Sequence, residues 1–167
     1  MKNMKMVLAL TIAGLVVSVA ADPAHAQSQS GAKTGSKQEM KQLNKEANKL
    51  GAKADEVADQ LGRNVVFCVL AAHTTDVGTA QQLKDKFSSL NDFPFGQFVA
   101  AVLLADRIDK PLDDIISKLV GGMSIGQITK EADVNMGDVR SGFGQFRSEL
   151  ARSETNPPTK DCFNSAP

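Results

Sequence analysis

Residues 98–105 form an unbroken apolar run, Phe-Val-Ala-Ala-Val-Leu-Leu-Ala, in the middle of a segment from Pro94 to Ile108. Leu and Ala are frequent in this segment, which favours a helix. A helix that is apolar on every face has to be buried on all sides. The pattern therefore predicts a buried central helix around which the other elements pack.

A second pattern begins at Ser36, because Ser36-x-x-Glu39 has the form of a capping box. Seven apolar positions then alternate in spacing between three and four, which is typical of a heptad seam. They are Met40, Leu43, Ala47, Leu50, Ala54, Val57 and Leu61. Gly51 interrupts the seam, so the segment is predicted as one helix or as two. We interpret it as a helix lying against the domain, with a self-associating coiled coil as the second interpretation.

Further helices follow from short local signals. Residues 65–72 are apolar and favour a helix over a strand, because no second strand is visible to pair with them. Residues 112–120 are amphipathic and end at a Gly-Gly pair. Three more helices begin at Thr79, Ser124 and Asn135, and the last of them ends near Arg152. The sequence predicts an all-α single domain of about six helices around the buried central one.

The N-terminus has the order of a secretory signal peptide. Lys2 and Lys5 precede an apolar run from Met6 to Ala21, and Ala24-His25-Ala26 is a small-x-small cleavage pattern. The apolar run is short for a membrane anchor, which needs about 20 residues. We expect residues 1–26 to be removed, residues 27–35 to be a flexible leader, residues 36–152 to be the helical domain and residues 153–167 to be an extended tail. The expected destination is the periplasm or the medium of a bacterium.

Composition narrows the function classes. Cleavage after Ala26 leaves 141 residues with 17 basic and 18 acidic side chains, so no general attraction to nucleic acid is expected. All eight Phe lie in this part, and the chain has no Trp or Tyr. Phe lacks a polar group and suits a core better than a polar ligand site.

Two cysteines in an exported chain favour a disulfide between Cys68 and Cys162. The ten residues that follow Arg152, up to and including Cys162, reach roughly 33 Å, so distance does not forbid the bond. The alternatives are two free thiols or a bridge between chains through Cys162.

Five lysines recur every four residues in the first predicted helix: Lys37, Lys41, Lys45, Lys49 and Lys53. At 3.6 residues per turn such a row drifts slowly around the helix and forms a basic stripe. It is the candidate interaction surface, for an acidic protein, an anionic envelope component or a peripheral membrane contact. The simpler interpretation, which we favour, is a solvated face partly neutralised by neighbouring acidic residues.

The segment from Ser124 to Phe146 is arranged like a helix-turn-helix unit, with Arg140, Gln145 and Arg147 on the outer side of its second helix. Export argues against DNA binding, because an exported protein meets no operator. A helix-turn-helix DNA-binding protein is the alternative if the N-terminus is not a signal peptide.

Catalysis is not expected from this sequence. His73 is the one histidine left after cleavage, and Asp76 at i+3 would be its candidate partner or fellow metal ligand. No Cys-x-x-Cys, His-x-x-x-His or phosphate-loop motif is present. We therefore predict a non-enzymatic protein without cofactor or metal, in which His73 caps a helix end.

The pattern from Phe95 to Val139 resembles that of small exported bacterial helical proteins of unknown function, over about a quarter of the chain. In that pattern a buried helix and a short Leu/Ile helix precede a turn-helix, here Gly122-Met123-Ser124-Ile125-Gly126-Gln127-Ile128. The resemblance implies a helical envelope protein and carries over no functional residue. The expected role is to bind a partner or to serve a structural function in the cell envelope.

Overall fold

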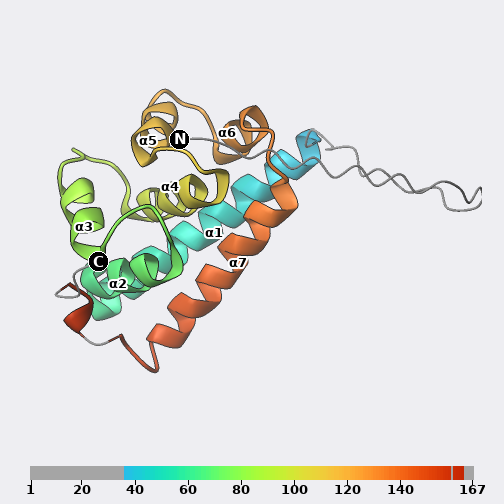
Figure 1. The fold of residues 1–167 in the computed structure, drawn as a ribbon. Helices are drawn as coiled ribbons and strands as arrows, with labels where there is room; N and C mark the ends of the chain where they lie inside the picture. Colours follow the sequence, from blue (N-terminus) through green and yellow to red (C-terminus); the bar gives the residue numbers. More distant parts are fainter. Residues whose placement is uncertain (1–35, 159, 164–167) are drawn as a thin grey trace, which may run out of the picture. The chain divides into compact units, whose positions relative to one another are not determined.

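The computed structural model describes residues 36–158 and 160–163, which contain seven α-helices, one 3-10 turn and no strand (Figure 1). The predicted signal peptide and leader lie outside the described residues. The all-α prediction is confirmed, with seven helices instead of about six. The elements are α1 (Lys37–Leu61), α2 (Arg63–His73), α3 (Ala80–Ser88), α4 (Phe95–Ile108), α5 (Leu112–Val120), α6 (Ile125–Glu131), α7 (Met136–Ser153) and the turn η1 (Lys160–Phe163).

Helix α4 is the buried element that the apolar run predicts. Every residue from 98 to 105 is buried, and Phe98, Val102 and Leu104 have no exposed surface. Its polar residues stand at the rim, where Gln97 and Arg107 are exposed. The core of the domain is therefore built around this helix.

Helix α1 is continuous from Lys37 to Leu61, so Gly51 does not break it. The predicted capping box is present, because Ser36 Oγ accepts the Glu39 N–H and the Glu39 carboxylate accepts the Ser36 N–H. The middle of the heptad seam is buried against α4 and α7. Because the chain's own core takes up the seam, the coiled-coil interpretation loses its contact surface.

Helices α1 and α7 lie side by side and run in the same direction (Figure 1). The register is fixed by three polar pairs in ascending order along both helices: Gln42 with Arg140, Glu46 with Arg147, and Lys53 with Glu154. Phe143, Phe146 and Leu150 of α7 point into the core and are buried. This packing brings residues roughly a hundred positions apart onto one surface.

The C-terminal segment folds back onto α2 and α3. Cys68 and Cys162 form the predicted disulfide, and their Cα atoms lie 5.7 Å apart. The turn η1 contacts both helices, and Cys162 and Phe163 pack against the core. The tail that was expected to be extended thus contains a folded turn. None of the described helices combines the length and the apolar character that crossing a membrane requires.

Candidate functional site

The structure divides the basic stripe of α1 into two parts. Four residues advance a helix by about 40° beyond a full turn, so the five lysines sweep across its exposed face. Lys37, Lys41 and Lys45 are exposed and form no ion pair within residues 36–158 and 160–163. We call these three side chains the lysine face. Lys49 and Lys53 point towards α7 and have carboxylate partners.

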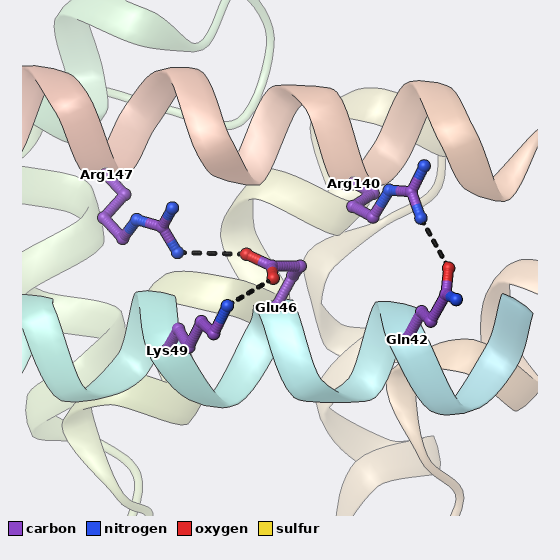
Figure 2. A network of polar contacts seen from close by, with 5 residues as sticks. All are labelled: Gln42, Glu46, Lys49, Arg140 and Arg147. Atoms are coloured by element: carbon purple, nitrogen blue, oxygen red, sulfur yellow. Dashed lines mark hydrogen bonds and ion pairs between the residues drawn. The ribbon is translucent and has the colours of Figure 1, made fainter.

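The Glu46 carboxylate contacts two cations, Lys49 of its own helix and Arg147 of α7 (Figure 2). Lys49 Nζ lies 2.7 Å from one carboxylate oxygen of Glu46, and Arg147 Nη1 donates to the other at 3.0 Å. The hydrogen bond from Lys49 lowers the pKa of the Glu46 carboxyl, partial desolvation opposes this, and the bond from Arg147 lowers the pKa further. Arg147 thereby joins α7 to α1 through Glu46, while Lys49 is paired with a carboxylate of its own helix.

Lys53 closes the other end of the same interface. Its Nζ donates to Glu154 at 2.7 Å and lies 3.2 Å from Glu56, while its side chain is 17% exposed. The hydrogen bond to Glu154, just past the end of α7, raises the pKa of Lys53. The solvated-face interpretation thus does not hold for Lys53, which is largely covered and joins two helices.

The arginines of the helix-turn-helix-like segment are also engaged with α1. Arg140 Nη1 donates to Gln42 at 2.7 Å beside the Glu46 pair (Figure 2). Together with the Arg147 bond, this directs both side chains along the α1–α7 contact. The sequence placed them on the outer side of a second helix, because it did not show that α1 packs along that side.

The exposed face of α1 changes sign along its length. Its N-terminal half carries the lysine face, and Glu39 there is held by the capping box. The C-terminal half carries Asp55, Glu56 and Asp59, all exposed. Lys49 and Lys53 are paired with carboxylates, so they add little net positive charge to the surface. The positive charge of α1 is therefore concentrated in its first three turns.

His73, the candidate catalytic residue, lies at the end of α2 but does not pair with Asp76. Its Nδ1 lies 2.9 Å from Glu149 Oε2 of α7, and its ring meets the Phe146 ring at 5.2 Å. Within residues 36–158 and 160–163, no three His, Cys, Asp or Glu side chains are grouped so as to hold a metal ion. The described contacts of His73 are those of a residue that joins α2 to α7.

A hollow of about 610 Å³ lies between α1, the start of α4 and the loop before α6. Two of its polar side chains are already used as helix caps. Asn44 accepts the Gly126 N–H at 2.7 Å, and Asp55 accepts the Gly96 N–H at 3.0 Å. These bonds satisfy donors that the ends of α6 and α4 would otherwise leave open. The hollow is thus explained by helix packing.

Comparison of the chain with family models, curated proteins and solved structures gave no significant match.

Proposed function

We propose that the protein is exported and acts without catalysis, by binding an anionic partner through the lysine face. The observation that supports this is the exposure of Lys37, Lys41 and Lys45 without ion pairs in the described part of the chain. Nearby carboxylates are engaged by Lys49, Lys53 and Arg147 instead. Three like charges on one exposed face attract anions most strongly at low ionic strength.

The partner class is an anionic envelope surface, and an acidic protein is the alternative that the same charges would serve. A negatively charged membrane surface attracts each lysine near it by about 1 kcal/mol, so three lysines give weak, reversible binding. Such a contact needs no membrane-spanning helix. It is consistent with a domain whose large apolar residues, apart from Leu61 and Val120, are buried or partly buried in the described part of the chain.

The test is sedimentation with vesicles that contain an anionic phospholipid, compared with zwitterionic vesicles, at low and high salt. The variant Lys37→Gln/Lys41→Gln/Lys45→Gln should lose the salt-dependent binding and keep its melting temperature. A matched variant, Lys110→Gln/Lys130→Gln/Arg152→Gln, removes three exposed charges elsewhere and should still bind. An equal loss of vesicle binding in both variants would show a non-specific charge effect. If wild-type protein binds neither kind of vesicle, the partner is not a membrane surface, and an acidic protein is then sought by crosslinking.

Export is the second part of the proposal. The alternative, a helix-turn-helix DNA-binding protein, requires a chain that stays with the chromosome. Cell fractionation with intact-mass measurement separates the two, because cleavage after Ala26 gives an exported chain that begins at Gln27. A full-length species in the cytoplasmic fraction would reject export.

A further inference from the structure

A second hollow, of about 590 Å³, lies between the first turn of α2, helix α3 and the loop that leads to α4. Its volume is within the range of about 300–1,000 Å³ that small-molecule sites occupy. Its apolar lining consists of Phe67, Phe87, Leu90 and Phe93. In the hollow beside α1 the Asp55 carboxylate caps a helix, whereas none of the charged side chains that line this second hollow caps one.

The apolar wall is part of an aromatic cluster. The Phe87 ring lies 5.1 Å from that of Phe95 and 5.2 Å from that of Phe98, in edge-on or tilted arrangements. Phe67 and Phe98 are buried, whereas Phe87 and Phe93 are only half-buried. The cluster therefore presents an aromatic surface to the hollow.

One cation lies over this aromatic cluster, and a second lines the hollow from α3. The guanidinium carbon of Arg63 lies 5.3 Å from the ring centroids of both Phe87 and Phe95. Lys84 lines the hollow from α3, with its Nζ 5.5 Å from the Phe163 ring. Neither side chain forms an ion pair within residues 36–158 and 160–163. Asp92 is the one carboxylate in the lining, so these three groups have a net charge of +1.

The Arg63 guanidinium has no ion-pair partner within residues 36–158 and 160–163, so its N–H groups are available to a ligand. Those N–H groups match the two oxygens of a carboxylate. An apolar body and one negative charge are thus accommodated side by side.

We propose that this hollow binds a small aromatic carboxylate, a molecule with one ring and one carboxylate on a short chain. The ring lies against Phe87 and Phe93, and the carboxylate accepts hydrogen bonds from Arg63 and Lys84. The site lies apart from the lysine face of α1 and does not depend on the proposed function.

The probe is 4-phenylbutyrate, titrated into the ¹⁵N-labelled protein and followed by amide chemical shifts. We expect a Kd below about 1 mM, as for a fragment-sized ligand, with the largest shifts in residues 63–67 and 84–93. The neutral amide of the probe and butyrate, which lacks the ring, should each bind at least about tenfold more weakly.

Arg63→Gln and Lys84→Gln should each weaken binding of 4-phenylbutyrate by about tenfold, whereas Lys130→Gln, an exposed charge on α6, should not. Melting curves check that each variant is folded. If Arg63→Gln does not fold, the binding affinity of Lys84→Gln tests the proposal by itself. The proposal is overturned if wild-type protein shows no saturable shifts at about 10 mM probe, if the shifts map elsewhere, or if the folded variants bind as wild type does.

Discussion

Gly96 and Gly51 meet backbone to backbone where α4 crosses α1. A Cβ atom on Gly96 would lie 2.5 Å from the Gly51 carbonyl oxygen and 2.6 Å from its Cα. Neither contact is with a flexible side chain, so the two helices would have to separate. This close approach accounts for a glycine inside α1, although glycine in a helix interior costs about 1 kcal/mol relative to alanine.

Gly96→Ala is therefore expected to destabilise the protein by about 1–3 kcal/mol, the usual range for overpacking, despite the better helix propensity of alanine. Chemical denaturation measures it. Gly144→Ala is the matched control, since nothing lies within 4 Å of its added Cβ. It should be neutral or stabilising, and a similar loss in both variants would contradict the close-crossing explanation.

Leu104→Ala should destabilise the domain by about 2–5 kcal/mol, because the side chain is fully buried in α4 and its removal leaves a cavity. Leu103→Ala should lower the free energy of unfolding somewhat less, because Leu103 is 5% exposed. Val120→Ala, at 73% exposure, serves as the control and should change little. Thermal melts of the three variants give the order, and a near-neutral Leu104→Ala would mean that α4 is not the core.

The local elements were predictable because their signals lie within a few residues. The capping boxes at Ser36, Thr79 and Ser124 all form as their sequences indicate. The buried run of α4 and the stop of α5 at Gly121 also follow from short patterns.

The polar pairs of the candidate site were not predictable, because they depend on how helices rotate against one another. Glu46 and Arg147 are 101 positions apart, and His73 and Glu149 are 76 apart. The four-residue spacing of the lysines predicts a stripe, but it does not predict which lysines form ion pairs once α7 packs against α1. Arg63 likewise has no local signal, since its two rings come from α3 and α4. Only tertiary packing assigns such partners.

The disulfide between Cys68 and Cys162 should be detectable as the absence of free thiols in denatured, non-reduced protein. Because it joins residues 94 positions apart, loop-closure entropy sets a ceiling of about 4–5 kcal/mol on its contribution to stability. Reduction should lower the melting temperature of wild type. It should not change that of the Cys68→Ser/Cys162→Ser variant, and a reducible dimer would place the bond between chains.

The last prediction concerns the acid stability that Glu46 provides. Its pKa in the folded state is lower than its ordinary value of 4.5, mainly because Lys49 and Arg147 donate to its carboxylate. A depressed pKa contributes stability above the unfolded-state value, and that contribution is lost as the pH falls through the folded-state value. Lys49→Gln should therefore lower the melting temperature near pH 7, with the difference from wild type shrinking as the pH falls below 4.5. Lys41→Gln removes the same charge from the same helix without breaking an ion pair, so it should follow wild type at each pH. If the two variants melt alike from neutral to acid pH, the Lys49–Glu46 pair adds no stability to the folded protein.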